Sequence, residues 1–121
     1  MKIKRLKSGI YRHRVPIYNQ RLYVSVGRDA AVNHFGEDGQ MAEEMAAGEK
    51  YLDDNGRFAV LIIIGEGYAN TNTIAHEAVH AAIDILDHVE VFYCAENQEP
   101  IAYLVGHIAE VIQACVDMEG A

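Results

Sequence analysis

The sequence predicts a compact α+β domain with a small sheet, whose elements follow the order strand, helix, strand, helix, helix. Three observations predict it. The chain has 121 residues, of which 50% are hydrophobic, which suits a single domain with one packed core. A continuous apolar run at Phe58–Ile64 is typical of a buried strand. After residue 73 the apolar residues follow a helical period to the end of the chain.

The first half of the chain is predicted to hold one strand and one interrupted helix. Val15–Gly27 is rich in β-branched residues and is predicted to form a strand, with a bend within it at Gln20. A helix is expected over Asp29–Tyr51, with Asp29 as its capping residue. The glycines within residues 36–39 break this helix, so that a second helical piece is expected at Met41–Lys50.

The second half opens on the best-defined elements. Gly65 ends the Phe58–Ile64 strand, and a cluster of N-capping residues follows at Asn70–Thr73. A helix is predicted over Ile74–Val89, where apolar residues recur every three or four positions. Glu90–Cys94 fits either a short strand or a helix end.

A last helix is predicted over Gln98–Met118. Asn97 is its expected cap, and Pro100 is tolerated within its first turn. The apolar positions expected to face the core share one stripe of this helix: Leu104, Ile108, Val111, Ile112 and Cys115.

Charge is distributed unevenly along the chain. Residues 1–28 hold eight of the ten basic residues and no acid, whereas residues 29–121 carry a formal charge of −16. The net charge of −8 argues against nucleic-acid binding through bulk positive charge. The basic segment either lies over the acidic body and neutralises it, or contacts nucleic acid or an acidic partner.

The cysteines and the apolar runs predict a protein of the cytoplasm. Cys94 and Cys115 lie 21 residues apart without a C-x-x-C motif, so we expect two buried free thiols rather than a disulfide framework or a cysteine zinc site. The longest apolar run has seven residues, whereas a membrane span needs about 20. No apolar stretch follows the basic start, so a secretory signal and a membrane partner are not expected.

One sequence motif contains candidate metal ligands and a candidate general base. His76-Glu77-Ala78-Val79-His80 is an H-E-x-x-H sequence inside the Ile74–Val89 helix. Residues i and i+4 lie about 40° apart around a helix, so both imidazoles can hold one metal ion. Glu77 follows His76 directly and can reach a water molecule on that ion as a general base.

Two histidines leave a catalytic zinc site one protein ligand short. The extended motif with a third histidine fails, because its glycine and histidine positions are occupied by Ile83 and Leu86. A carboxylate from the next helix is the other solution, and Glu99 lies nineteen residues after His80. Glu96 and His107 remain as alternative third ligands.

This arrangement resembles the gluzincin branch of the zincin-like metallopeptidases. H-E-x-x-H followed about twenty residues later by a helical Glu, and the block from Glu99 to Gly106, are also similar to small zincins encoded by phages and prophages. The resemblance covers residues 58–108 specifically and residues 1–57 only in layout. It implies a single zincin-like domain over residues 1–121 that binds zinc through His76, His80 and Glu99.

The resemblance implies a zinc peptidase that acts on a peptide or protein, in a host cytoplasm if the chain is phage-encoded. An extended substrate is expected to pair with the edge of the Phe58–Ile64 strand. Tyr103 shares a helix face with Glu99 and is a candidate donor to the oxyanion, as are Tyr68, Tyr93 and His107.

Two other functions stay open: a non-catalytic, zinc-stabilised binding protein on the same scaffold, and hydrolysis of a non-peptide amide. His13 and His34 lie outside the motif and are expected at the surface.

Overall fold

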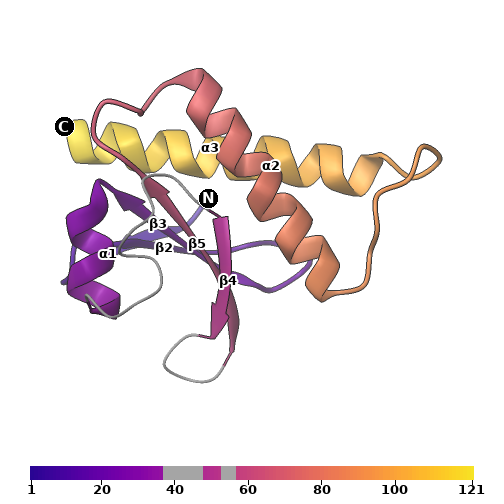
Figure 1. The fold of residues 1–121 in the computed structure, drawn as a ribbon, viewed down its shortest axis with the longest axis horizontal. Coiled ribbons are helices and arrows are strands. Elements are labelled where there is room, and N and C mark those ends of the chain that lie inside the picture. The colour runs from indigo at the N-terminus through magenta and orange to yellow at the C-terminus, as the bar shows by residue number, and fades with distance from the viewer. Residues whose placement is uncertain (37–47, 53–56) are drawn as a thin grey trace.

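A computed structural model describes residues 1–36, 48–52 and 57–121 of the chain. It has an α+β fold, which confirms the predicted class (Figure 1). The strands are β1 (Ile3–Arg5), β2 (Tyr11–Arg14), β3 (Arg21–Val26), β4 (Gly48–Leu52) and β5 (Phe58–Ile64), and the helices are α1 (Arg28–Phe35), α2 (Thr71–His88) and α3 (Glu99–Gly120).

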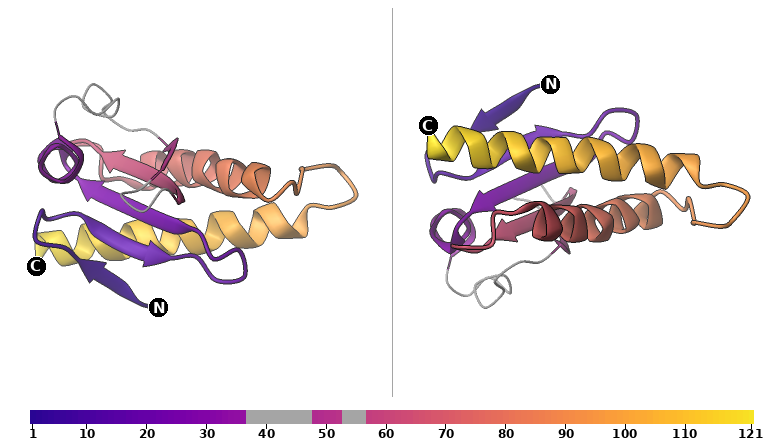
Figure 2. Two further views of the ribbon diagram at one scale, coloured as in Figure 1. Left: turned by 90° about the horizontal axis from the view of Figure 1, so that it is seen from below. Right: turned by 90° about the horizontal axis from the view of Figure 1, so that it is seen from above.

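The strands form one mixed sheet in the order β1-β2-β3-β5-β4. β3 and β5 are parallel, whereas the other neighbouring strands are antiparallel. The parallel pair requires a crossover connection, and α1 lies within it. Figure 2 shows α1 on one side of the sheet and α2 and α3 side by side on the other.

Each face of the sheet has its own core. The larger core packs alternate residues of β3 and β5, such as Leu22 and Ile62, against the inner faces of α2 and α3. The smaller core packs Tyr23 and Leu61 from the opposite face against Ala30 and its neighbours in α1. β5 is therefore buried on both faces, which explains why its sequence is continuously apolar rather than alternating.

Two helices agree with the sequence in position and packing. Asn70 caps α2, and its side-chain oxygen accepts a hydrogen bond from the Thr73 backbone N–H at 2.9 Å. Pro100 lies in the first turn of α3. All five apolar positions predicted for the inner stripe of the last helix are buried. By length and hydropathy α3 would also suffice to cross a membrane, and here its inner stripe packs in the larger core.

The structure corrects the predicted strand at Val15–Gly27. The chain forms an antiparallel hairpin of β2 and β3, with a turn over Val15–Gln20 between them. The turn carries no glycine, and it places the non-glycine residues Ile17 and Asn19 at φ values of 72° and 56°. The bend expected at Gln20 is thus the end of a full reversal of the chain, which the apolar residues Val15 and Ile17 conceal in the sequence.

The helix predicted over Asp29–Tyr51 is also corrected. α1 ends at Phe35, its N-cap is Gly27, and Asp29 lies within its first turn. Most of the piece predicted at Met41–Lys50 lies outside the described residues, and its last three residues belong to β4. β4 reaches this position because it pairs with β5 along its whole length.

Smaller corrections concern the connection between α2 and α3. Gln98, not Asn97, is the N-cap of α3, and it makes no side-chain capping bond. Glu90–Cys94 belongs to neither a named strand nor a helix, although Cys94 forms an isolated bridge with Asn97. Cys94 is exposed, contrary to prediction, because this loop extends beyond the cores, whereas Cys115 is buried as predicted.

Candidate functional site

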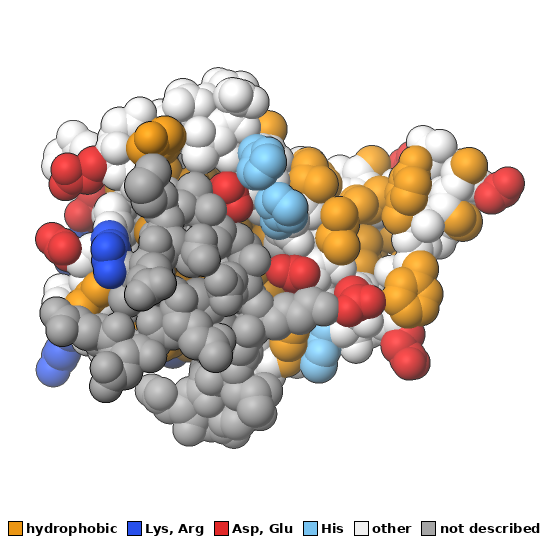
Figure 3. Space-filling view, viewed as in Figure 1, with side chains coloured by type: hydrophobic (Ala, Val, Ile, Leu, Met, Phe, Trp, Pro, Cys, Tyr) orange, Lys and Arg blue, Asp and Glu red, His pale blue; other side chains and the backbone are white. Residues whose placement is uncertain are grey.

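The two histidines of the H-E-x-x-H motif lie together on the outer face of α2. Their Nε2 atoms are 3.2 Å apart and their ring centroids 4.8 Å apart. Both side chains are exposed, as are Val79 and Ile83 beside them. In Figure 3 this face of the molecule shows histidine and hydrophobic side chains gathered over α2. The predicted convergence of His76 and His80 is thus present in the structure.

Glu77 occupies the side of α2 that turns toward the protein. Successive helix residues are rotated by about 100°, so Glu77 leaves the helix well away from the outermost point of the histidine face. Its side chain is 4% exposed, and it is one of few polar groups buried in the described part of the chain. A carboxylate held in this way is shielded from bulk water while lying next to the histidine pair.

Glu99 does not join the histidines in this structure. Among residues 1–36, 48–52 and 57–121, no three His, Cys, Asp or Glu side chains are grouped closely enough to hold a metal ion. Ile101, two residues after Glu99, lines a small cavity together with Leu86. The start of α3 therefore lies beside the C-terminal end of α2, several turns away from His76. Glu99 and the alternative Glu96 are both exposed.

His107, the other alternative ligand, belongs to a second histidine pair. Its Nε2 lies 2.9 Å from Nε2 of His13, which is 5% exposed and not at the surface as predicted. His13 Nδ1 donates to the Lys2 carbonyl oxygen at 2.6 Å. Burial, and then the neighbouring His13, lower the pKa of His107 below its ordinary value. Tyr103 stacks beside His107, with ring centroids 6.2 Å apart, and remains half exposed.

The edge of β5 is closed to a substrate. β5 pairs with β3 on one side and with β4 on the other, so it has no free hydrogen-bonding edge. The predicted pairing of a peptide with Phe58–Ile64 is therefore wrong. Among the described strands, β4 is the outer one on this side of the sheet and pairs only with β5.

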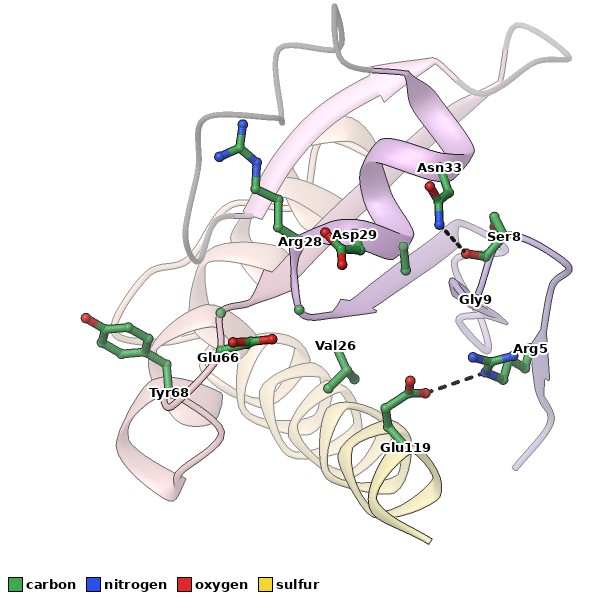
Figure 4. Close-up of a pocket in the computed structure, with 13 residues that line it drawn as sticks. Arg5, Ser8, Gly9, Val26, Arg28, Asp29, Asn33, Glu66, Tyr68 and Glu119 are labelled. Atoms are coloured by element: carbon green, nitrogen blue, oxygen red, sulfur yellow. Dashed lines mark hydrogen bonds and ion pairs between the residues drawn. The ribbon is translucent and has the colours of Figure 1, made fainter.

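A second candidate site is a cavity of about 630 Å³ at the carboxyl ends of the parallel strands. Its wall includes Gly27 and Gly65, which follow β3 and β5, and the first turn of α1. Figure 4 shows Glu66 near Asp29 and, across the cavity, an ion pair between Arg5 and Glu119, whose closest atoms are 3.5 Å apart. Such crevices at the ends of parallel strands are common ligand sites.

Sequence reasoning missed this cavity because the strand pairing was not visible. Two strands that each end in glycine, at Gly27 and Gly65, were the available signal. Only the parallel register, in which Val26 lies opposite Ile64, brings the two glycines together. The last turn of α3 completes the wall, since Glu119 also accepts a hydrogen bond from the Tyr11 hydroxyl.

Comparison of the chain with protein-family models, with curated proteins and with solved structures gives no match.

Proposed function

We propose that the protein is a zinc-dependent, zincin-like peptidase that hydrolyses a peptide or protein amide bond. The observation that carries the proposal is the 3.2 Å separation of the His76 and His80 Nε2 atoms. Two nitrogens bound at about 2.0–2.1 Å to one tetrahedral zinc ion lie about 3.3–3.4 Å apart. The pair therefore fits two positions of such a site with little rearrangement.

His76 and His80 would hold the metal ion, and Glu99 is the proposed third ligand. Bound zinc would supply Lewis acidity toward the substrate carbonyl and lower the pKa of water. Glu99 would have to approach the histidines from the start of α3. The start of α3 lies several turns of α2 away from His76, so this approach requires the loop over residues 89–98 and the first turn of α3 to rearrange.

Glu77 is the proposed general base. Its position next to His76 and its burial suit a carboxylate that accepts a proton from the attacking water and passes it to the leaving amine. Tyr103 is the donor to the oxyanion that the sequence suggests, but its ring stacks beside His107, which contacts His13 of β2. The proposed substrate strand β4 lies at the other end of the sheet, so Tyr103 would reach the oxyanion only after a rearrangement.

The proposed substrate is an extended peptide that adds to the free edge of β4. β4 is the outer strand of the sheet, and it contacts α2, the helix that carries the histidines. Backbone pairing along this edge would present a scissile bond toward α2. Val79 and Ile83 are 39% and 47% exposed on that helix, and they offer apolar contacts to the side chains of the peptide.

A non-catalytic, zinc-stabilised binding protein is the second candidate. The observation that favours it is the separation of Glu99 from the histidines among the described residues. On this function, zinc would hold the α2 face in place without turnover. Glu77 would then have a structural role only, and Glu77→Gln would leave binding of the partner intact.

The decisive experiment measures metal content of protein purified without added metal or a histidine tag. We expect about one zinc per chain in the wild type and in Glu77→Gln, and clear loss in Glu99→Ala. Glu96→Ala tests the alternative ligand, because Glu96 is an exposed carboxylate three residues earlier, and loss of zinc from this variant alone would assign the third position to Glu96. Absence of stoichiometric metal in the wild type, even after zinc is supplied, would overturn both candidate functions.

Cleavage of a peptide library separates the two candidates. The peptidase predicts cleavage by the zinc-loaded wild type and none by Glu77→Gln with its zinc retained. A zinc-loaded wild type that cleaves no peptide would leave the binding protein as the better description.

A further inference from the structure

Among the described residues, those that cover the face of the sheet opposite α3 cover it only in part. α1 packs over β3 and β5, and its core includes Tyr23, Ala59 and Leu61. Along β2 the side chains alternate: Tyr11 and His13 turn toward α3, where they meet Glu119 and His107. Arg12 and Arg14 therefore project from the opposite face.

This uncovered part of the sheet is a basic surface. The antiparallel register places Lys4 opposite Arg12, and Arg14 opposite Arg21, so their side chains share one face. Together with Lys2 they line one depression of about 340 Å³, whose wall contains no acidic residue among the described ones. We call the surface formed by Lys2, Lys4, Arg12, Arg14 and Arg21 the basic face.

Four cations of the basic face do not neutralise the acidic body in the described part of the chain. Arg5 pairs with Glu119, but it lies on the other side of the sheet with Tyr11. Lys2, Lys4, Arg12 and Arg14 make no ion pair with a described carboxylate. Holding these four cations together on one surface raises their mutual repulsion, which an anionic ligand would relieve.

An exposed apolar tip stands at one end of the basic face. Ile17 is the central residue of a three-residue γ-turn, in which the Tyr18 N–H donates to the Pro16 carbonyl oxygen at 2.8 Å. Its φ of 72° is strained for a β-branched side chain, which remains 79% exposed. Arg14 and Arg21 flank the turn, and Figure 2 shows this connection at the margin of the molecule.

We propose that the basic face and the Ile17 tip form a binding surface for double-stranded nucleic acid. The five cations would contact phosphates of the backbone, and Ile17 would enter a groove against the bases. Apolar wedges of this kind, flanked by basic side chains, are a recurring way to engage a minor groove. This inference is independent of the proposed metal site on α2.

The surface chemistry favours a duplex over a single strand. Binding of single strands relies on exposed aromatic side chains on which bases stack. Tyr23 is the aromatic residue aligned with Arg12 across the strands, and it is buried under α1. Tyr18, directly beside Ile17, packs in part against the larger core. The remaining chemistry is side-chain charge and one apolar tip, which suits the regular phosphates and grooves of a double helix.

The test measures binding of the wild-type chain to a labelled 20-base-pair DNA duplex by fluorescence anisotropy, over a series of salt concentrations. Five phosphate contacts predict a slope of log K against log salt of about −4 to −5. Arg12→Gln with Arg14→Gln should reduce this slope by about 2 and weaken binding at least tenfold in low salt. Lys7→Gln removes an exposed cation outside the basic face, and it should change neither quantity by more than a single weak contact would.

Ile17→Gly tests the tip separately from the charges. Glycine accepts the backbone conformation at this position, so the fold should persist while affinity for the duplex falls several-fold at an unchanged salt slope. A thermal melt of each variant confirms that it is folded.

Three results would overturn the proposal. One is no binding of the duplex at 50 mM salt. Another is equal weakening by Lys7→Gln and by the Arg12 and Arg14 substitutions. The third is tighter binding to vesicles of anionic phosphatidylserine than to duplex DNA or duplex RNA, which would assign the surface to a membrane instead.

Discussion

His13 and His107 join the sheet to the last helix through their imidazole rings. Their Nε2 atoms are 2.9 Å apart, although the residues are separated by 94 positions in the chain. The Lys2 carbonyl can only accept, so His13 donates from Nδ1. A neutral His107 ring can share one hydrogen bond with Nε2 of His13, so the contact depends on the protonation of His107.

This contact predicts that the fold weakens in mild acid. The pKa of His107 is lowered in the folded chain, so below about pH 6.5 the unfolded chain binds more protons than the folded one. The stabilisation is complete above pH 6.5 and is lost as the pH falls through the folded-state pKa. Chemical denaturation at pH 7.5 and 5.5 should show a smaller loss of stability for His107→Gln than for the wild type. An equal loss in both would contradict this assignment.

The two thiols should differ in reactivity. Burial raises the pKa of Cys115 to about 12, so its thiolate is scarce near neutral pH, whereas Cys94 is exposed. We expect a thiol reagent to modify one cysteine per native chain and two per unfolded chain. Cys94→Ser should abolish the native reaction. Rapid modification of Cys115 in that variant would show that α3 opens readily.

The N-cap of α2 should contribute measurably to the free energy of unfolding. Asn70→Ala removes the acceptor for the Thr73 N–H and should lower the free energy of unfolding by about 1 kcal/mol. Asn72→Ala is the matched control, because Asn72 is exposed within the first turn and is not the cap. Urea denaturation of the two variants should therefore separate them. Equal stability would mean that this end of α2 is frayed.

Replacing Ile17 by glycine should relieve the strain in its turn and raise the stability of the fold. Relief of the positive φ of a β-branched residue is worth about 1 kcal/mol or more. For a chain of this size that corresponds to a rise in Tm of about 3–6 °C. Ile17→Ala, which removes the apolar side chain but keeps the strain, should not produce this rise. Calorimetry distinguishes the two variants.

Local sequence patterns were sufficient for part of the fold. β5, α2 and α3 follow from an apolar run, a capping residue and a helical stripe, each of which acts over a few residues. The hairpin turn at Val15–Gln20 was missed because residues other than glycine adopt its positive φ angles. β4 was missed because its strand conformation depends on pairing with β5 rather than on its own residues.

The candidate site, like the fold, could be predicted from the sequence only where local geometry determines it. The convergence of His76 and His80 is set by helix geometry alone and is present as predicted. The distance from Glu99 to this pair depends on how α3 packs against α2, which spacing along the chain does not determine. The burial of His13 and the free edge at β4 likewise arise from contacts between distant segments.

The parallel pairing of β3 with β5 has a consequence for how the chain folds. Tyr23 lies opposite Leu61, and Tyr11 bonds Glu119 across 108 residues, so parts of the sheet and of the core depend on contacts between distant segments. Such topologies fold slowly, because long loops must close before their contacts become favourable. Until α2 and α3 dock, one apolar face of the β3 and β5 pair stays uncovered. Slow refolding at high concentration should therefore compete with aggregation through this strand.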